Sequence, residues 1–507
     1  YVNNVKVKFK GVNRHVHWPT SGRAVNRNIS LNDALLIKEM NMNAVRMSHY
    51  SPDKHFLEIC DSLGLYVLDE LTGWQYPPYD TSIGREKVKE LITRDANHPC
   101  VVIWDNGNEG GFNFELLPSY ARYDIQKRAV IHPWLEEKDV NTYHYISYGV
   151  GTHFYFGGNK VFFPTEFLHG LYDGGHGAGL DDYWNLMYNN PLSAGGFLWD
   201  FADQGVVRDD KNGFMDTDGD HGADGILGPY REKEGSFYTI KEVWSPVYLE
   251  GTKFLPPSFD GKIKVQNRYH FTNLNQCSFS AEWVKFDYPS GKVSVTKAKL
   301  EVPDIAPGYV DYLKIETPAD FTHYDALYLK AIDPYGKEIY TWTRTITTAG
   351  EYAQKLIPAT ANNTTKQEET VSEITFRAGN TKLVIDKAKG IINQIEVGGK
   401  TLPLTNGPCF TTGNLEISET KYFEENNAHI AEFWLRPQNT SGQKSTRNYI
   451  RISLLPSEWI ALEYAFDVAG LYNHIGVTFD FPDSNVKSVK WLGNGPYRVW
   501  KNRMKGV

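Results

Sequence analysis

The stretch RDANHPCVVIWDNGNEGG, residues 94–111, decides how the first half of the chain folds. Its residues 100–104 are almost entirely apolar, and the sequence turns polar from Asp105 onward. A strand of a parallel barrel is buried along its length, and the residues that do chemistry gather where the strand ends. The stretch therefore predicts a buried strand that carries Asn108 and Glu109 to the carboxyl end of a parallel barrel.

Residues 1–245 repeat this alternation of short apolar strands with helices, which is typical of β/α units. We expect one helix to begin at Ser30, because its spacing from Asp33 resembles a capping box. A second helix should begin at Ser51 and end at Gly64. The pattern predicts a (β/α)8 TIM barrel.

The remainder of the chain lacks helical periodicity. Strand-like runs joined by turn residues predict an Ig-like β-sandwich over residues 246–350. Residues 351–372 are polar and lack periodicity, so we interpret them as a linker. Strands resume over residues 373–507 and predict a second all-β unit. We therefore expect a multidomain protein that combines an α/β barrel with all-β domains.

The composition of the 507-residue chain excludes several classes of partner. It has 53 Lys and Arg residues against 61 Asp and Glu residues, and its formal net charge is −8. Binding to nucleic acid needs a basic excess that neutralises phosphates, so nucleic acid is not an expected partner. No run approaches the roughly 20 apolar residues that a membrane-spanning helix needs, so no span is expected. The four cysteines form no CxxC pair, so we expect neither a zinc site nor a disulfide framework.

A second carboxylate follows another apolar strand, in VFFPTEFLHG, where Glu166 stands after residues 161–164. Two glutamates on neighbouring strand ends could lie about 5–5.5 Å apart, the separation at which one attacks an anomeric carbon while the other protonates the leaving oxygen. Burial at an apolar barrel rim should raise the pKa of Glu109, as a general acid requires. The alternative for each glutamate alone is a structural role at the end of a strand.

Aromatic residues make up 14% of the chain, with 13 Trp and 31 Tyr, which suits stacking on sugar rings. In SAGGFLWDFADQG, residues 193–205, Trp199 stands at the end of a third apolar strand. Its indole is a candidate floor for a sugar site. Packing in the core is the alternative.

Six stretches occur in the order of a known family. They resemble the barrel of glycoside hydrolase family 2, and most closely its β-galactosidases. The stretches are GVNRHVHWP (11–19), NAVRMSHYSPD (43–53), LYVLDE (65–70), RDANHPCVVIWDNGNE (94–109), PTEFLHG (164–170) and GGFLWDFADQG (195–205). Near the end of the chain, WLGNGPYRVWKNR (491–503) resembles the C-terminal β-supersandwich of those enzymes.

The resemblance implies roles for individual residues. Glu109 would be the acid/base and Glu166 the nucleophile, with Arg46 fixing and ionising Glu166. Asn108 would hold the 2-hydroxyl of the sugar. Further substrate-binding candidates are His49 for the hydroxyls, His169 near the 6-hydroxyl, Trp199 as the platform, His15 and His17 near the mouth, and either Tyr143 or Tyr145 as partner to the nucleophile.

The chain departs from the family after LYVLDE. The galactosidases continue with a Glu-Thr-His-type segment that helps to bind magnesium, whereas residues 71–80 read LTGWQYPPYD. The usual magnesium site is therefore expected to be incomplete, and we predict no required cofactor and no metal ligand, with a divalent metal as the alternative. Trp74 and Tyr76 are expected to wall a pocket for an oligosaccharide derived from a polysaccharide.

The resemblance implies a retaining exo-β-glycosidase, a β-galactosidase that releases a terminal sugar by double displacement. One alternative is a β-glucuronidase, although the Asn-Lys-Gly segment of those enzymes is not evident. The other is a carbohydrate-binding protein without turnover. The chain begins at Tyr1 and stops directly after a strand-like run, so we expect a truncated supersandwich and missing terminal modules. The location stays open between a periplasmic or secreted one and, as the alternative, a cytoplasmic one. The oligomeric state also stays open between a monomer and a homo-oligomer.

Overall fold

The computed structural model describes residues 1–506 apart from 173–174, 288–289, 357–362, 439–446, 468–469, 473, 490, 492 and 494–503. The chain divides into two compact units. The first comprises Tyr1–Phe286, Val293–Ile346 and Gly493–Val507, and the second comprises Asp287–Lys292 and Thr347–Leu492.

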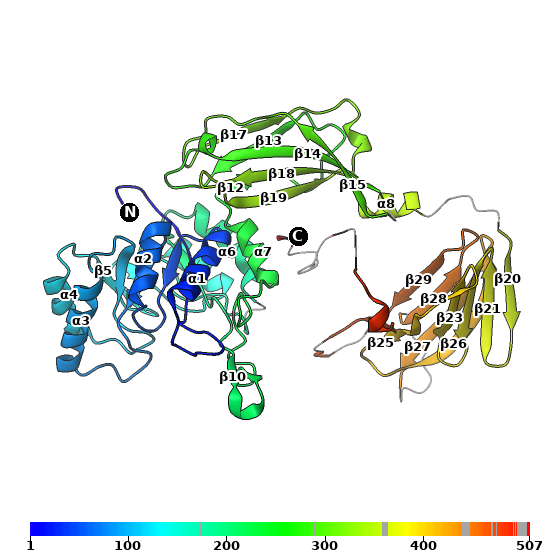
Figure 1. Ribbon diagram of the computed structural model, residues 1–507, viewed down its shortest axis with the longest axis horizontal. Helices are drawn as coiled ribbons and strands as arrows, with labels where there is room; N and C mark the ends of the chain where they lie inside the picture. The colour runs from blue at the N-terminus through cyan, green and yellow to red at the C-terminus, as the bar shows by residue number, and fades with distance from the viewer. Residues whose placement is uncertain are drawn as a thin grey trace. The chain divides into compact units, whose positions relative to one another are not determined.

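A parallel sheet forms the centre of the first unit (Figure 1). Its strands, in spatial order, are β5 (Ala129–Ile131), β4 (Val101–Asp105), β3 (Tyr66–Glu70), β2 (Ala44–Arg46), β1 (Phe9–Asn13) and β9 (Gly195–Leu198). β7 (Val140–Asn141) pairs in parallel with β8 (Val161–Phe162), and parallel bridges Phe162–Ser193 and Phe167–Leu198 join the β8 segment to β9. These eight segments follow one another in the order that a barrel requires.

Helices cover the outside of the sheet and bury their apolar faces against it. They are α1 (Arg27–Glu39), α2 (Lys54–Leu63), α3 (Thr81–Asp95), α4 (Leu117–Tyr123), α5 (Tyr148–Gly157), α6 (His176–Asn189) and α7 (Gly235–Val243). Between β5 and β7 the described chain has a short antiparallel pair of β6 (Glu136–Glu137) with β7 in place of a helix, so the regular (β/α)8 alternation is interrupted there. No helix among the described residues is long and apolar enough to cross a bilayer.

The helix boundaries depend on capping groups that the sequence patterns only partly located. α1 begins three residues before Ser30, because the side chain of Asn26 accepts hydrogen bonds from the first backbone N–H groups of the helix. α2 begins at Lys54 rather than at Ser51. The predicted end at Gly64 is confirmed, with a φ of 67° that a glycine adopts without strain.

Two antiparallel sheets follow the barrel within the first unit. One is β12 (Val247–Leu249), β13 (Lys262–Asn267), β17 (Val310–Ile315) and β16 (Leu300–Glu301), and the other is β15 (Lys292–Ala298), β14 (Ser278–Asp287), β18 (Ala326–Ile332) and β19 (Glu338–Thr345). Their inward residues, such as Trp283, Leu313 and Leu329, form one core. Outside these sheets lie the hairpin β10 (Val206–Arg208) and β11 (Phe214–Asp216) and the short 3-10 helices η1 (Phe114–Leu116), η2 (Asp209–Lys211), η3 (Leu274–Gln276) and η4 (Phe321–His323).

The second unit begins with α8 (Ala349–Leu356) and is otherwise built from strands. One sheet is β20 (Thr365–Glu369), β21 (Glu373–Ala378), β22 (Thr381–Asp386), β23 (Ile391–Val397), β25 (Thr405–Phe410) and β30 (Val477–Asp480), with β24 (Lys400–Leu402) paired to β23. The other is β26 (Leu415–Glu425), β27 (Ala428–Pro437), β28 (Tyr449–Leu454) and β29 (Ile460–Ala465), and η5 (Asp483–Asn485) follows β30. The two sheets share a core that includes Phe376, Phe433 and Ile452.

The predicted linker over residues 351–372 is only partly irregular. Residues 351–356 complete α8, and residues 365–369 form β20, which pairs with β21 along its whole length. The polar composition misled the sequence analysis because an edge strand exposes most of its side chains. The motif over residues 491–503 lies almost entirely outside the described residues.

A buried charge cluster ties α1 to the barrel. Both oxygens of Asp33 carry partners, with Arg14 Nη2 at 2.8 Å from Oδ2 and Arg231 Nε at 2.6 Å from Oδ1. The three side chains are at most 2% exposed. The contacts with Asp33 offset part of the cost of burying the two guanidinium groups inside the barrel.

Replacing Asp33 with Ala should therefore destabilise the barrel by about 3–5 kcal/mol, because two buried cations lose their counter-ion. Hydrogen exchange of peptides from α1, followed across a urea series, measures the change. The matched control is Glu58→Ala, which breaks the exposed pair with Arg27 and should cost less than about 1 kcal/mol. Equal losses in the two variants would contradict the prediction.

Candidate active site

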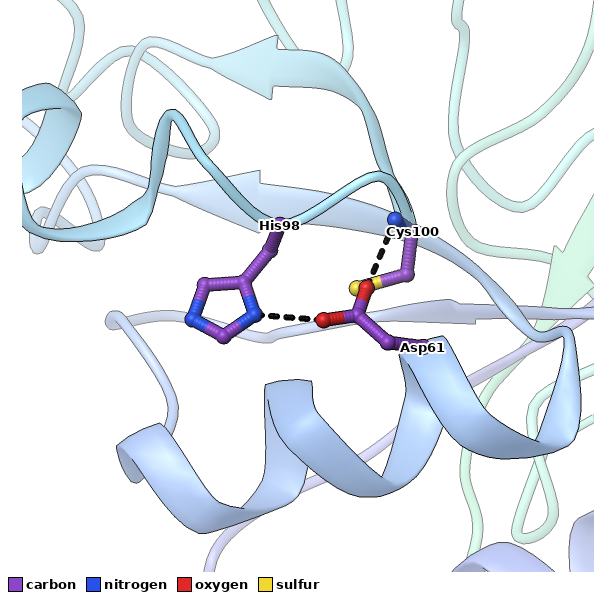
Figure 2. A group of neighbouring side chains, drawn as sticks. All are labelled: Asp61, His98 and Cys100. Carbon is purple, nitrogen blue, oxygen red and sulfur yellow. Dashed lines mark hydrogen bonds and ion pairs between the residues drawn. The ribbon is translucent and has the colours of Figure 1, made fainter.

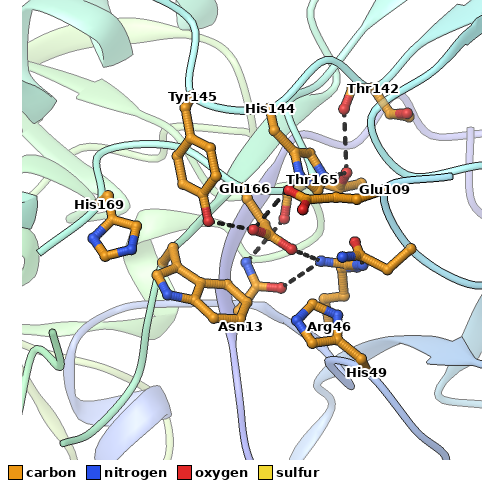
Figure 3. Close-up of polar contacts among 12 residues, drawn as sticks. Asn13, Arg46, His49, Glu109, Thr142, His144, Tyr145, Thr165, Glu166 and His169 are labelled. Atoms are coloured by element: carbon orange, nitrogen blue, oxygen red, sulfur yellow. Dashed lines mark hydrogen bonds and ion pairs between the residues drawn. The ribbon is translucent and has the colours of Figure 1, made fainter. Parts of the chain in front are cut away.

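The guanidinium group of Arg46, at the end of β2, is completely buried and contacts carboxylates from three other strand ends. Its Nη1 lies 2.6 Å from Glu166 Oε1 (Figure 3). Its Nη2 lies 2.7 Å from Glu70 Oε2, and its Nε lies 2.9 Å from Asp105 Oδ2. The strand-end positions follow from the parallel barrel, in which all carboxyl ends meet at one face. Arg46 thereby fixes the orientation of Glu166.

Arg46 also orients two asparagine side chains. It donates from Nη1 to Asn13 Oδ1 at 2.9 Å and from Nη2 to Asn108 Oδ1 at 2.8 Å. Because the oxygen of Asn108 faces Arg46, its amide nitrogen faces away, and this buried Nδ2 has no hydrogen-bond partner among the described residues. Asn108 lines the pocket described below, so the free amide is a donor available to a bound molecule.

Glu109 reaches the site through a tight turn after β4. Gly107 has a φ of 84°, and a Cβ atom there would lie 2.6 Å from the carbonyl oxygen of Gly111. Glu109 itself has a φ of 44°, a backbone conformation that residues other than glycine rarely adopt. Its Oε1 lies 2.8 Å from His144 Nδ1, and its Oε2 accepts a hydrogen bond of 3.2 Å from the amide of Gln75.

Glu109 and Glu166 face each other at this rim. One carboxylate oxygen of each residue and a ring nitrogen of His144 all lie within 4.8 Å of one another. Glu166 is 2% exposed and receives a hydrogen bond from the hydroxyl of Tyr145. The geometry brings together the two glutamates that the sequence analysis selected.

The two carboxylates differ in their electrostatic surroundings. Burial alone would raise the pKa of Glu166, but the positive field of His144 and Arg46 outweighs it and brings the pKa to about 2. Burial likewise acts to raise the pKa of Glu109, yet the hydrogen bond and electrostatic attraction of His144, together with the hydrogen bond from Gln75, outweigh burial and bring the pKa below its ordinary value. The predicted upward shift of the Glu109 pKa is therefore wrong, because no sequence pattern marks His144 as a neighbour of Glu109.

A pocket of about 300 Å³ opens over these groups. Trp199 follows β9, lies stacked on His49 with ring centroids 5.2 Å apart, and donates from Nε1 to Asp224 Oδ2 at 2.9 Å. Burial raises the pKa of Asp224 to about 6, and its Oδ1 has no hydrogen-bond partner among the described residues. The pocket is lined by His49, Trp74, Asn108, Glu109, Tyr145, Glu166, His169, Leu171, Tyr172, Trp199, Gln204, His221 and Asp224.

Most residues selected from the sequence line this pocket, but His15, His17, Arg46 and Tyr76 are not among its lining residues. His17 does not line it, because its side chain is buried beside Arg231, which donates to the His17 carbonyl oxygen. Of the two tyrosines left open, Tyr145 contacts Glu166, whereas Tyr143 packs against Phe154.

Three comparisons relate the chain to known proteins. The family described as "Glycosyl hydrolases family 2, TIM barrel domain" matches residues 1–139. A β-galactosidase of Priestia megaterium is 29% identical over 317 residues, which is 55% of this chain and 30% of the relative. A β-galactosidase of Yersinia enterocolitica is 31% identical over 254 residues, which is 42% of this chain and 23% of the relative. The chain thus spans less than a third of the length of these relatives.

Residues 1–139 are thus similar to the TIM-barrel domain of glycoside hydrolase family 2, and longer stretches of the chain are similar to β-galactosidases. The family match covers β1 to β5 and so includes Arg46 and Glu109. It confirms the predicted TIM barrel as the fold of this part of the chain. Among solved structures, a family 2 β-galacturonidase of Eisenbergiella tayi aligns with a TM-score of 0.38 and 20% identity, covering 48% of this chain and 51% of the other.

The magnesium site implied by the family resemblance does not fit this chain. Residues 71–80 contain no histidine and only one carboxylate, Asp80, whose side chain caps α3 instead. Trp74 and Tyr76 are 63% and 82% exposed, and neither side chain is a ligand that magnesium prefers. Gln75 is already bonded to Glu109. No chemical step is therefore assigned to magnesium here.

A second group of potential ligand atoms lies at the amino end of β4, where Asp61, His98 and Cys100 meet (Figure 2). Asp61 Oδ2 lies 2.6 Å from His98 Nδ1, and Asp61 Oδ1 accepts a hydrogen bond of 2.9 Å from the backbone N–H of Cys100. Burial raises the pKa of the Cys100 thiol, which keeps the sulfur protonated and unreactive. The cluster joins α2 to the turn before β4 and has a structural role.

Asp224→Asn should change how stability depends on pH. The carboxyl of Asp224 ionises near pH 6 in the folded chain and near pH 4 in the unfolded chain. Between these values the folded state binds more protons, so the wild type loses stability as pH rises, whereas the variant has no such loss. Urea unfolding gives the free energy of unfolding of both proteins at pH 4 and at pH 7. The variant's value minus the wild-type value should be on the order of 2 kcal/mol larger at pH 7 than at pH 4. An equal difference at both pH values would contradict the raised pKa.

Proposed function

We propose that the chain carries the catalytic barrel of a retaining exo-β-glycosidase, with Glu166 as nucleophile and Glu109 as general acid and base. The observation that carries the proposal is the approach of the two carboxylates to within 4.8 Å. Retaining glycosidases hold these groups about 5–5.5 Å apart, whereas inverting enzymes leave about 6.5–9.5 Å for a water molecule. The short separation favours direct attack on the sugar.

In the first step, Glu166 attacks the anomeric carbon while Glu109 protonates the glycosidic oxygen. The low pKa of Glu166 keeps it ionised, and the contacts with Arg46 and Tyr145 hold its two oxygens in place. A glycosyl ester forms on Glu166 as the bond to the aglycone breaks. In the second step, Glu109 takes a proton from water, which attacks the same carbon and releases the sugar.

The sugar that best fits the pocket is a neutral one, and we assign it as galactose. Asn108 offers a free donor, and Asp224 offers a free acceptor, for hydroxyl groups. The curated relatives named above are β-galactosidases. A site that pairs its buried polar groups with sugar hydroxyls discriminates strongly against analogues that lack them.

The β-glucuronidase alternative is less well supported. Recognition of a uronate needs a cation or an amide clamp for its carboxylate. No lysine or arginine is among the described residues that line the pocket, and Asp224 adds negative charge. The alternative of a binding protein without turnover conflicts with the presence of both carboxylates and of the Arg46 contact that ionises one of them.

Exposed aromatic side chains at the pocket favour an oligosaccharide substrate. Trp74 and Tyr172 line the pocket and are 63% and 73% exposed. Flat aromatic rings at the surface stack on successive sugar rings. We propose that they hold the sugars on the leaving side of the bond, as would suit a chain end released from a polysaccharide.

We further propose the finer fold assignments. The two four-stranded antiparallel sheets that follow the barrel fit an Ig-like sandwich in size and strand number. The two sheets of the second unit, together with the motif over residues 491–503, fit part of the family's β-supersandwich.

A panel of nitrophenyl β-glycosides tests the proposal. The chain should hydrolyse the β-galactoside and leave the β-glucuronide unchanged, because the described lining of the pocket includes no lysine or arginine for a uronate. Glu166→Gln should lower kcat by at least about a thousandfold while sugar binding persists. Glu250→Gln, at a half-exposed glutamate of the sandwich, is the control and should retain full activity. Preferred hydrolysis of the glucuronide, or no hydrolysis of any glycoside by the folded chain, would overturn the assignment.

A further inference from the structure

His144 lies between the two carboxylates of the site. It follows β7, and its side chain is 1% exposed. Nδ1 lies 2.8 Å from Glu109 Oε1 and 3.5 Å from Glu166 Oε2, and Nε2 lies 2.8 Å from Thr165 Oγ1 (Figure 3). Both ring nitrogens therefore have close polar neighbours, and the directions of these hydrogen bonds decide where the protons lie.

The hydroxyl of Thr165 fixes the direction of the first bond. Thr165 Oγ1 donates to the carbonyl oxygen of Thr142 at 3.2 Å, so only its lone pairs remain for His144. Nε2 must then carry a proton and donate it to Thr165. Nδ1 faces Glu109 Oε1, and two lone pairs 2.8 Å apart with no hydrogen between them would repel each other. A further proton must therefore lie between His144 and Glu109.

The charges around the ring favour placing that proton on the histidine. The ionisable groups that face His144 are Glu109 and Glu166, together with Tyr145, whose ring packs edge-on at 5.7 Å. Trp134 stacks beside the imidazole and is neutral. Arg46 lies on the far side of Glu166, to which it is paired. An imidazolium between two carboxylates is stabilised by both and relieves their mutual repulsion.

We propose that His144 is a positioning residue that holds the transferable proton of the acid step on Nδ1 and shares it with Glu109. The inference rests on the proposed role of Glu109 as acid and base. It accounts for a general acid whose own pKa lies below the ordinary value, because the proton is stored by the pair rather than by the carboxyl alone. Glu109 can then be ionised and still deliver a proton.

The proton balance through the cycle is complete. In the first step the shared proton passes through Glu109 to the leaving oxygen, as the bond from Glu166 to the anomeric carbon forms and the glycosidic bond breaks. This leaves a carboxylate facing the bare Nδ1 of a neutral imidazole, a contact that favours the return of a proton. In the second step Glu109 takes a new proton from the attacking water. The protonated pair of Glu109 and His144 is restored as the glycosyl ester on Glu166 breaks.

The pH dependence of kcat/KM in His144→Asn tests the proposal. An asparagine amide can still donate to Glu109 but cannot store a proton. For a β-glycoside with a poor leaving group, the basic limb should move to lower pH by about one unit or more, because a carboxyl alone loses its proton earlier than an imidazole between carboxylates. At neutral pH, kcat/KM should fall about 10- to 100-fold. For a dinitrophenyl glycoside, whose leaving group departs without taking up a proton, kcat/KM of the variant should stay within about threefold of the wild-type value.

His323→Asn, at an exposed histidine of the sandwich, is the matched control and should leave both profiles unchanged. An unshifted basic limb in His144→Asn, or equal losses for the two leaving groups, would show that His144 only supports the structure. The glycoside pair is chosen from those that the wild type hydrolyses. Absence of hydrolysis by the wild type would therefore count against the proposed function, and a normal wild type with an unshifted variant would count against His144 alone.

A spectroscopic measurement keeps the inference testable where activity is low. In ¹⁵N-histidine NMR of the resting chain at neutral pH, assigned by difference with His144→Asn, both ring nitrogens of His144 should be protonated. Protonation of a single nitrogen would overturn the proposal. Thermal unfolding of the same samples shows whether the variant retains its fold.

Discussion

The buried guanidinium of Arg46 is the interaction on which the barrel rim depends. Carboxylates from β3, β4 and the segment after β8 all converge on it, as do two asparagine oxygens. A buried cation with so many acceptors is stable only where each lies at hydrogen-bond distance. The strands must therefore keep the register that brings their ends together, and the site and the fold are constrained by the same contacts.

A single arginine does not ionise all of its partners equally. Burial raises the pKa of Asp105 to about 8 despite its contact with Arg46, and burial also raises that of Glu70. Glu166 alone is brought down to about 2, because His144 and Tyr145 act on it together with Arg46. Among the carboxyls that contact Arg46, Glu166 is therefore the one whose pKa is lowered, as an ionised nucleophile requires.

The strand-end residues could be predicted from the sequence because an apolar run followed by polar residues marks the rim of a barrel. Glu109, Glu166 and Trp199 all came from this signal. His144 gave no such signal, because β7 has only two residues and is the second strand of a hairpin with β6, with no helix before it. The lowered pKa of Glu109 depends on that histidine, which lies 35 residues away in sequence, and so it was predicted in the wrong direction. The same limit applies to β20, whose polar residues form an edge strand only through pairing with β21.

The central claim is that Glu166 attacks the sugar while Glu109 faces it from within 4.8 Å. Incubation with a 2-deoxy-2-fluoro-β-galactosyl fluoride, followed by peptide mapping with mass spectrometry, reads the attacking residue directly, since the fluorine slows release of the glycosyl ester. The account predicts one fluorosugar per chain, attached to Glu166. A label on Glu109 or on any other residue would contradict it, as would hydrolysis of galactosides by a chain that never acquires the label.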